Sequence, residues 1–338
     1  MRRLLPFLVT AAALLGAPAA ASAVPIIGIG DQKPDMFSDP RFRALEIKDA
    51  RLLVGWDTLR SRSQTAVLDR WMAAAQEAGV QPLISFAHSL LRDRRRKLPQ
   101  PVEMQREFLK FRARYPWAKT FATWNEGNHC GEPVCHRPEL TAIYYNGERR
   151  ACPTCTILAA EVLDQPGMVA WIRAFMTKAH GDPRKMIWGI HNYVDANRLR
   201  TIGTRRLLAH TRGPVWFTET GGIVYRRNRS HITFPESKAH AAIATRWLFT
   251  KLIPLSPRIK RVYLYNWNSP GKRQTWDSAF INPHGQVRPA YGVFVREMEK
   301  LNPPTLEPQP PAEPPPAEPQ PAEPQPAPAP EQPPPASP

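Results

Sequence analysis

Two stretches of the chain, TFATWNEG (residues 120–127) and PVWFTETGG (residues 214–222), decide the fold prediction. Each is a short run rich in apolar and β-branched residues that leads to a glutamate, Glu126 in the first and Glu219 in the second. Apolar runs of this kind are typical of parallel strands that are covered on both faces. Similar runs recur along the chain at a nearly constant spacing, with a helical pattern after most of them.

The whole alternation predicts the fold class. The expected strands are 25–30, 50–56, 81–87, 120–124, 156–161, 186–191, 214–218 and 261–266. The expected helices are 65–78, 101–114, 138–150, 168–180, 201–210, 235–252 and 287–301, with a weaker pattern in 39–47. Eight strands that alternate with helices predict an α/β fold, a single (β/α)8 barrel. A doubly wound open sheet is the alternative, but Gly28 and Gly30 alone make a weak phosphate-binding fingerprint.

The two ends of the chain differ in composition from its middle. Residues 1–23 combine Arg2 and Arg3, an apolar run and an Ala-Ser-Ala sequence at 21–23, which predicts a secretory signal peptide. Residues 303–338 hold eighteen of the 39 prolines, five glutamates and no base. Such a segment buries too little apolar surface to order itself, so we expect a disordered tail. The folded domain is therefore expected at 24–302, extracytoplasmic, secreted or attached to the cell wall, with no transmembrane segment.

The net charge of +17 bears on the partners. Both arginines of the signal peptide and all five tail glutamates lie outside the predicted domain, so the domain itself is strongly basic. A basic field favours an anionic glycan or an anionic cell-envelope surface, and a biased arginine content without a specific partner is the alternative. Because no nucleic-acid motif is visible and export is predicted, we expect no nucleic-acid partner. We also expect a monomeric protein.

Four cysteines lie in the middle of the chain: Cys130, Cys135, Cys152 and Cys155. In an exported protein an even number predicts disulfides, and a zinc site that includes the flanking histidines is the alternative. In a barrel, the first pair would follow the fourth strand and the second pair would precede the fifth. A helix between them would hold the pairs roughly 20 Å apart, so local pairing is expected.

Glu126 and Glu219 are the candidate catalytic residues. Reactive groups of such barrels lie at the carboxyl ends of the strands, where both glutamates occur. Two carboxyl groups at one barrel mouth suit cleavage of a glycosidic bond, since one, kept protonated by its surroundings, protonates the leaving oxygen while the other attacks the anomeric carbon or activates water. In the alternative, each glutamate caps a helix or pairs with one of the many arginines.

With these residues, the chain from about 25 to 298 resembles the retaining glycoside hydrolases of clan A, the superfamily of cellulases, mannanases and xylosidases. In that clan the fourth strand ends in Asn-Glu and the seventh in a nucleophilic glutamate. The resemblance implies that Glu126 is the acid/base, that Glu219 is the nucleophile, and that Asn125 hydrogen-bonds the sugar 2-hydroxyl. It also implies a carbohydrate substrate and no metal or organic cofactor.

The resemblance extends to four further substrate-binding candidates. His191 and Tyr193 match an H-x-Y element in which the tyrosine hydroxyl holds the nucleophile carboxylate and the histidine lines the cleft. Trp267 matches an aromatic platform under the sugar, and His88 matches a histidine after the third strand. The second strand ends in Gly55-Trp56-Asp57, where many members of the clan have an arginine instead, so this chain departs from the clan's pattern there. Trp56, Trp124 and Asp57 are expected to line the cleft, and Asp31 after the first strand is a further candidate. A place in the core is the alternative for Trp267, Tyr193 and His88.

The sequence thus predicts a secreted glycoside hydrolase that cleaves a β-linked polysaccharide or oligosaccharide with retention of configuration. A carbohydrate-binding or wall-associated barrel without catalytic activity is the competing hypothesis.

Overall fold

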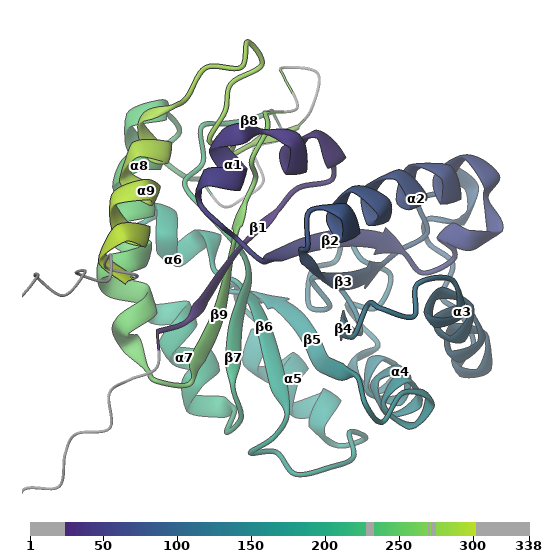
Figure 1. Cartoon of the computed structure of the whole chain (residues 1–338). Coiled ribbons are helices and arrows are strands. Elements are labelled where there is room, and N and C mark those ends of the chain that lie inside the picture. The colour runs from purple at the N-terminus through teal and green to yellow at the C-terminus, as the bar shows by residue number, and fades with distance from the viewer. Residues whose placement is uncertain (1–23, 228–232, 270, 272–274, 302–338) are drawn as a thin grey trace, which may run out of the picture. The chain divides into compact units, whose positions relative to one another are not determined.

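The computed structural model describes residues 24–227, 233–269, 271 and 275–301. Eight parallel strands of this part close into a barrel in chain order: β1 (Ile26–Gly30), β2 (Asp49–Gly55), β3 (Gln81–Ala87), β4 (Thr120–Ala122), β5 (Thr156–Leu163), β6 (Ile187–His191), β7 (Val215–Thr220) and β9 (Ile259–Tyr265). The last strand pairs with the first, from Ile26 opposite Arg261 to Gly30 opposite Tyr265. Figure 1 shows this closure as the purple β1 beside the green β9. The predicted (β/α)8 barrel is confirmed.

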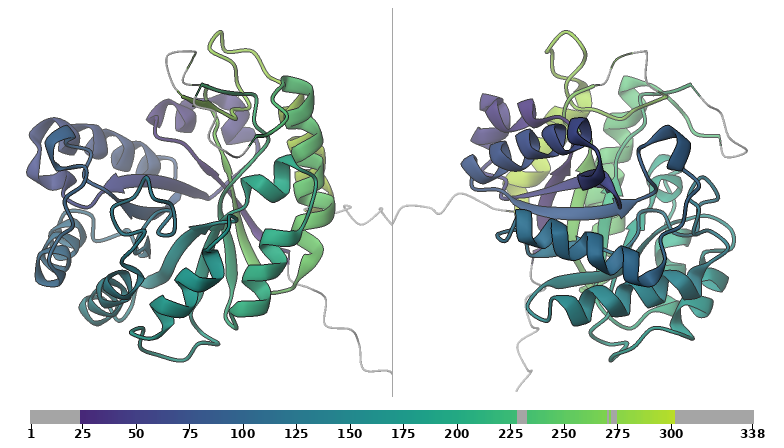
Figure 2. Two further views of the ribbon diagram at one scale, coloured as in Figure 1. Left: turned by 180° about the vertical axis from the view of Figure 1, so that it is seen from behind. Right: turned by 90° about the vertical axis from the view of Figure 1, so that its right-hand side faces the viewer.

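Helices surround the barrel on the outside, as the views from different sides show (Figures 1 and 2). The α-helices are α1 (Pro40–Ala44), α2 (Arg62–Glu77), α3 (Pro101–Arg114), α4 (Pro138–Ala151), α5 (Met168–Met176), α6 (Tyr193–Asn197), α7 (Ile202–His210), α8 (Lys238–Trp247) and α9 (Pro289–Leu301). Short 3-10 turns are η1 (Pro34–Ser38), η2 (Thr58–Arg60), η3 (Arg92–Arg94) and η5 (Ile253–Leu255), and η4 (Leu248–Leu252) is a π-helical extension of α8. The weak pattern in 39–47 corresponds to the single short turn of α1.

Two features were not predicted. The loops after β7 and β9 pair with each other through β8 (Tyr225–Arg226) and β10 (Trp276–Asp277), which form a small antiparallel sheet. The short helix α6 follows β6 directly. Two-residue strands carry too little periodicity for a sequence pattern to indicate them.

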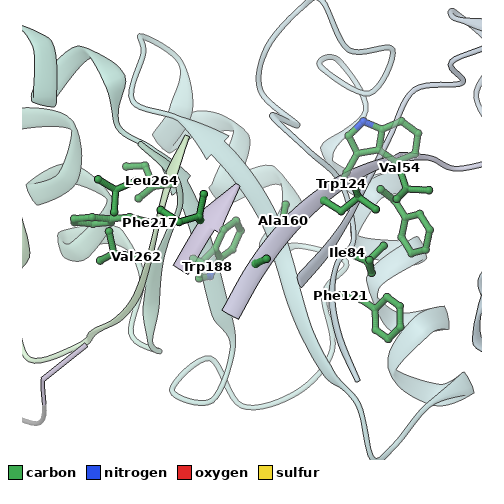
Figure 3. Close-up of a cluster of buried hydrophobic side chains, with 14 of the residues drawn as sticks. Val54, Ile84, Phe121, Trp124, Ala160, Trp188, Phe217, Val262 and Leu264 are labelled. Carbon is green, nitrogen blue, oxygen red and sulfur yellow. The ribbon is translucent and has the colours of Figure 1, made fainter. Parts of the chain in front are cut away.

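The main core lies between the barrel and its helices. Figure 3 shows residues of this layer, among them Val54, Ile84, Phe121 and Val262, all buried. The ring of Phe121 contacts Phe86, Phe108 and Phe111 at centroid distances of 5.1–6.2 Å. Since truncation of a buried phenylalanine to alanine costs about 3–5 kcal/mol, this layer is the principal source of stability.

The barrel interior has an apolar layer toward the amino ends of the strands, here called the lower layer, and a polar layer toward their carboxyl ends, here called the upper layer. The lower layer consists of Leu83, Ala122, Leu158, Trp216 and Tyr263. Gly28 makes room for it, because a Cβ there would lie 2.6 Å from the ring of Tyr263 and 2.8 Å from the carbonyl oxygen of Asp49. Gly28 is therefore needed for close packing inside the barrel. It is not part of a phosphate-binding turn, as the alternative of a doubly wound open sheet would require. The polar layer above is the floor of the candidate site.

The predicted signal peptide (1–23) and the predicted tail (303–338) lie outside the described residues. Among the residues that are described, no helix has the length and hydropathy that crossing a bilayer requires.

Candidate active site

The two candidate glutamates lie at the same end of the barrel. Glu219 is the second-to-last residue of β7, and Glu126 follows β4 with a left-handed backbone, φ 47°. Both side chains are partly exposed, at 23% for Glu126 and 17% for Glu219. Nδ1 of His191 lies 3.0 Å from Oε1 of Glu126 and 4.0 Å from Oε2 of Glu219. The two oxygens are thus at most about 7 Å apart, compatible with the carboxyl separations of about 5 to 9.5 Å in glycosidases.

Both carboxylate oxygens of Glu219 are held by donors. The hydroxyl of Tyr193 donates to Oε1 at 3.0 Å, so the hydrogen bond that the resemblance implied is present. Nη1 of Arg51 donates to Oε2 at 2.6 Å. A charge-assisted contact of this length fixes the orientation of the carboxylate strongly.

Arg51 is the centre of the polar layer and was missed by the sequence analysis. Its side chain is 2% exposed and forms a two-pronged ion pair with Glu161 of β5, at 2.9 and 2.7 Å. Nη2 also donates to Oδ1 of Asn125 at 2.7 Å, and Nε donates to Ser85. Arg51 lies inside β2, before the strand end at Gly55-Trp56-Asp57.

Glu161 is fully buried, and Gly189 provides its space. A Cβ at Gly189 would lie 2.8 Å from Cγ of Glu161. Burial alone would raise the pKa of this carboxyl, but the charge of Arg51 and the interaction with His191 hold it well below its ordinary value. Glu161 is therefore a permanent anion beneath the site, where it neutralises the guanidinium.

His191 lies below both catalytic candidates and is fully buried, so it does not line the cleft as expected. Burial alone would lower its pKa. The charge of Glu219 and the interactions with Glu126 and Glu161 raise the pKa of His191 to about 9. At neutral pH the imidazolium donates through Nδ1 to Glu126.

The same contact acts on Glu126. Burial opposes its ionisation, but the hydrogen bond and charge of His191, together with His129 and Arg51, lower the pKa of Glu126. This differs from the expectation that its surroundings keep the acid/base protonated. In this site the proton resides on the imidazole of His191, and the carboxylate of Glu126 accepts a hydrogen bond from that imidazole.

Neither predicted tryptophan offers an open face. Trp267 is 0% exposed, and its indole N–H donates to Asp39. Its ring packs edge-to-face against Phe42, Phe280 and Tyr291. Trp56 is 2% exposed, with the guanidinium groups of Arg60 and Arg94 at 4.9 and 5.5 Å from its ring. Both belong to the packed interior, so this structure does not support their assignment as substrate platforms.

Other aromatic side chains are closer to the carboxylates. Tyr265, at the end of β9, is partly exposed, and the charge of Glu219 contributes to raising its pKa well above the ordinary range, after burial as the larger cause. Trp276 of β10 is also partly exposed, and its ring meets Tyr193 at 4.6 Å and 71°. Trp276 could not be found from the sequence, because it reaches the site through the small β8–β10 sheet.

The remaining candidates are fixed by neighbours. His88 is partly buried, and its Nδ1 lies 2.6 Å from Oε1 of Glu132 in the loop after β4. Asn125 is 7% exposed, and its amide oxygen is bound by Arg51. Three further candidates for the cleft wall, Asp31, Asp57 and Trp124, are also buried.

All four cysteines are paired. Cys130 bonds to Cys135, with Cα atoms 5.0 Å apart, and Cys152 bonds to Cys155, with Cα atoms 5.3 Å apart. The predicted local pairing is confirmed. Sulfurs in a disulfide lack the thiolate that zinc requires, so the grouping of Cys130 and Cys135 with His136 does not fit a metal site.

No family model and no curated protein sequence matches the chain. Solved structures do match. The chain is similar to native xylanase 10B from Thermotoga maritima, with a TM-score of 0.57 and 13% identity, over 83% of this chain and 97% of that one. It is similar to GH5_18 from Streptomyces cattleya in complex with GlcNAc, with a TM-score of 0.56 and 14% identity, over 85% and 82%. A third similar structure is the exo-beta-1,4-mannosidase Op5Man5 from Opitutaceae bacterium strain TAV5, with a TM-score of 0.56 and 14% identity, over 82% and 59%.

Identities this low establish a shared fold. The likeness confirms the barrel that the resemblance to clan A implied, and the chemistry of this chain is argued from its own residues below.

Proposed function

We propose that the protein is a secreted glycoside hydrolase that cleaves O-glycosidic bonds of a polysaccharide or oligosaccharide with retention, using Glu219 as nucleophile and Glu126 as acid/base. One observation carries the proposal: two partly exposed carboxyl groups, from the ends of β4 and β7, both lie near Nδ1 of one buried histidine. A pair of carboxyl groups at a barrel mouth, oriented by buried donors, is the arrangement that this hydrolysis requires.

In the first step, an oxygen of Glu219 attacks the anomeric carbon as the bond to the leaving oxygen breaks. The leaving oxygen takes one proton from the Glu126–His191 pair. The product of this step is a glycosyl ester on Glu219. Tyr193 and Arg51 hold the carboxylate in position for attack, so that little reorganisation accompanies the reaction.

In the second step, a water molecule gives its proton back to the Glu126–His191 pair and attacks the same carbon. The ester bond breaks, and Glu219 leaves as the carboxylate. Two displacements at one carbon restore its configuration, and the site returns to its original protonation state.

The chain offers groups that suit a sugar. Arg51 fixes the side-chain oxygen of Asn125, which directs the amide N–H groups away from the guanidinium and leaves them for a sugar hydroxyl. The apolar C–H faces of a sugar stack on aromatic rings, and Tyr265 and Trp276 are the partly exposed rings near Glu219. A β-linked chain is the substrate that the resemblance to clan A suggests.

Substitution tests the assignment. Glu219→Gln and Glu126→Gln keep the side-chain size, and we expect each to lower the release of reducing ends from a panel of glycans by about 10³-fold or more. Glu139→Gln is the matched control, since Glu139 is exposed at the start of α4. Equal turnover by Glu219→Gln and the unaltered protein contradicts the proposal. Glycan binding without any turnover by the unaltered protein supports the non-catalytic hypothesis instead.

The configuration of the first-formed product tests the mechanism. Proton NMR of the anomeric signal, recorded before mutarotation, is expected to show the configuration of the substrate. Carboxyl groups about 5 to 5.5 Å apart favour this outcome, whereas a separation of about 6.5 to 9.5 Å admits a water and gives inversion. An inverted product would keep the two glutamates but assign Glu219 as a general base.

Export is part of the proposal. The signal-like sequence at 1–23 and the two disulfides support a place outside the reducing cytoplasm. After expression in a secreting host, mass spectrometry of the exported protein is expected to find Val24 as the first residue. A protein retained in the cytoplasm with residues 1–23 attached contradicts it.

A further inference from the structure

The loop between β3 and α3, residues 88–100, is strongly basic on its outer side. Its exposed cations are Arg92, Arg95, Arg96 and Lys97, and Asp93 is the exposed acid among them. We name residues 88–100 the basic loop. Within the described part of the chain, no carboxylate pairs with Arg92, Arg95 or Arg96, in contrast to Arg60 and Arg94, which form ion pairs.

The contacts of the basic loop place it at the active-site end of the barrel. At its start, the backbone N–H and ring of His88 both contact Glu132 in the loop that follows Glu126. Further along, Nη1 of Arg96 donates to the carbonyl oxygen of Cys130 at 3.3 Å. The neighbouring His129 lies 3.6 Å from Oε2 of Glu126. One short chain of contacts therefore connects the basic loop to the proposed acid/base.

The basic loop is also anchored on its other side. Nε of Arg94 donates to the buried Asp57 at 2.8 Å, and its guanidinium lies 5.5 Å from the ring centre of Trp56. Leu90 packs closely over Gly55 at the end of β2. Anchors at β2 and β4 hold the exposed cations at a fixed place above the barrel mouth. Pre-positioned groups lose less freedom on binding a ligand than groups on a free loop do.

The loop that follows Glu126 adds one exposed cation, Arg137. Its acid Glu132 is buried and bound by His88 and Trp124. Clustered like charges raise the potential over a surface and attract counter-charges. Three of the four exposed cations of the basic loop are arginines, whose planar guanidinium binds carboxylate and sulfate groups in two-pronged fashion.

We propose that the basic loop binds the acidic groups of a glycan chain that is bound at Glu126 and Glu219, so that the substrate class is an acidic polysaccharide, one with uronate or sulfate groups. This inference rests on the proposed glycosidase function and deepens it. A glycan is favoured over another polyanion because Arg96 contacts Cys130, whose neighbour His129 lies beside the proposed acid/base Glu126.

Charge-neutralising substitution tests the proposal. The variant Arg92→Gln/Arg95→Gln/Arg96→Gln removes three exposed charges at the mouth. The matched control Lys119→Gln/Lys178→Gln/Lys185→Gln removes three exposed charges from loops at the opposite end of the strands. Both are made in the Glu219→Gln background so that chains remain intact during binding. The probes are oligogalacturonate and oligomannuronate as acidic chains and xylo- and manno-oligosaccharides as neutral ones, measured by isothermal titration at low and high salt.

We expect the basic-loop variant to bind an acidic probe at least about 10-fold more weakly at low salt, with the difference shrinking at high salt. Neutral probes and the control variant are expected to stay within about twofold of the parent. The proposal is overturned if both triple variants weaken acidic binding equally, because the effect is then that of net charge alone. It is also overturned if acidic probes bind no better than neutral ones, or if inorganic polyphosphate displaces the acidic probe at equal charge concentration.

Measurements of turnover distinguish the proposed acidic substrate class from the proposed glycosidase function. Hydrolysis of neutral chains without any preference for acidic ones leaves the glycosidase function standing and removes the acidic substrate class. If acidic chains bind through the basic loop but the unaltered protein hydrolyses no chain, the proposed binding surface is supported and the proposed glycosidase function is contradicted.

Discussion

Nδ1 of His191 lies 3.0 Å from Oε1 of Glu126, which places a buried imidazolium directly against the carboxyl group proposed as acid/base. A glutamate that acts alone as a general acid needs a raised pKa, and the pKa of Glu126 is lowered. Three carboxylates, Glu126, Glu161 and Glu219, face the two cations Arg51 and His191. The site therefore retains one proton on the Glu126–His191 pair across the neutral range.

This pairing predicts the alkaline limit of activity. The pKa of His191 is raised to about 9, so the pair keeps its proton below that pH and loses it above. We expect kcat/KM to fall as the pH rises through about 9. In His191→Asn the proton must reside on Glu126 itself, so the alkaline limb is expected to move at least one pH unit lower. The pH profile of kcat/KM for both proteins checks this.

His129→Asn is the control for that profile. Nδ1 of His129 lies 3.6 Å from Oε2 of Glu126, but its side chain is 47% exposed and solvent screens its charge. A shift smaller than that of His191→Asn is expected. An alkaline limb that stays in place in His191→Asn would show that another group supplies the proton.

Arg51 is predicted to matter for both folding and activity. Arg51→Met leaves Glu161 as an uncompensated buried charge, which costs about 3–5 kcal/mol. The melting temperature is therefore expected to fall sharply. Activity should fall as well, because Oε2 of Glu219 loses the donor that orients it.

A double variant separates the two roles. Arg51→Met/Glu161→Gln removes both charges of the buried pair, so most of the lost stability is expected to return. Activity is not expected to return, because the contact from Arg51 to Glu219 is still absent. Melting curves and kcat/KM of the single and double variants give the comparison. Recovery of activity in the double variant would assign Arg51 a structural role alone.

The barrel was predictable because its signals are local. Eight apolar runs, separated by helical patterns, indicate strands and helices one at a time, and Glu126 and Glu219 follow from their place after such runs. Local spacing also sufficed for the disulfides, since their partners are five and three residues apart. Tyr193 was found through a short motif next to its strand.

The polar layer under the site could not be predicted from local sequence patterns. Arg51 and Glu161 come from different strands 110 positions apart, and each looks like an ordinary interruption of an apolar run. That Arg51 and Glu161 neutralise each other's charge becomes visible only when the barrel places β2 and β5 on opposite sides of one interior. For Trp267, the resemblance implied an aromatic platform and a core position was the alternative; in the structure Phe42 and Tyr291, from helices distant in sequence, pack against its buried ring.

A buried acid away from the site predicts a pH-dependent stability. Glu148 of α4 accepts a hydrogen bond from Thr123 at 2.7 Å, and its other oxygen has no partner among the described residues. Burial raises the pKa of Glu148 from 4.5 to about 8. The folded state thus disfavours ionisation, and stability falls as the pH rises from 4.5 through 8, by up to about 1.4 kcal/mol per pH unit.

Glu148→Gln removes this dependence. We expect its melting temperature to rise relative to that of the unaltered protein as the pH increases from 5 to 8, on top of a constant offset from the amide. Glu139→Gln, at an exposed position of the same helix, provides the baseline. A difference between Glu148→Gln and the parent that is constant with pH contradicts the assignment of a neutral Glu148.

The two disulfides are predicted to differ in their effect on activity. Cys130–Cys135 closes the loop that carries Glu132 and begins next to His129, near Glu126, whereas Cys152–Cys155 lies at the other end of α4. Opening a loop of a few residues costs little chain entropy, so both double serine variants are expected to fold. Cys130→Ser/Cys135→Ser should lower kcat/KM several-fold, because the loop that positions the acid/base loses its constraint. Cys152→Ser/Cys155→Ser should leave kcat/KM unchanged and lower only the melting temperature; equal losses of kcat/KM in both variants would show that the first disulfide has no special relation to the site.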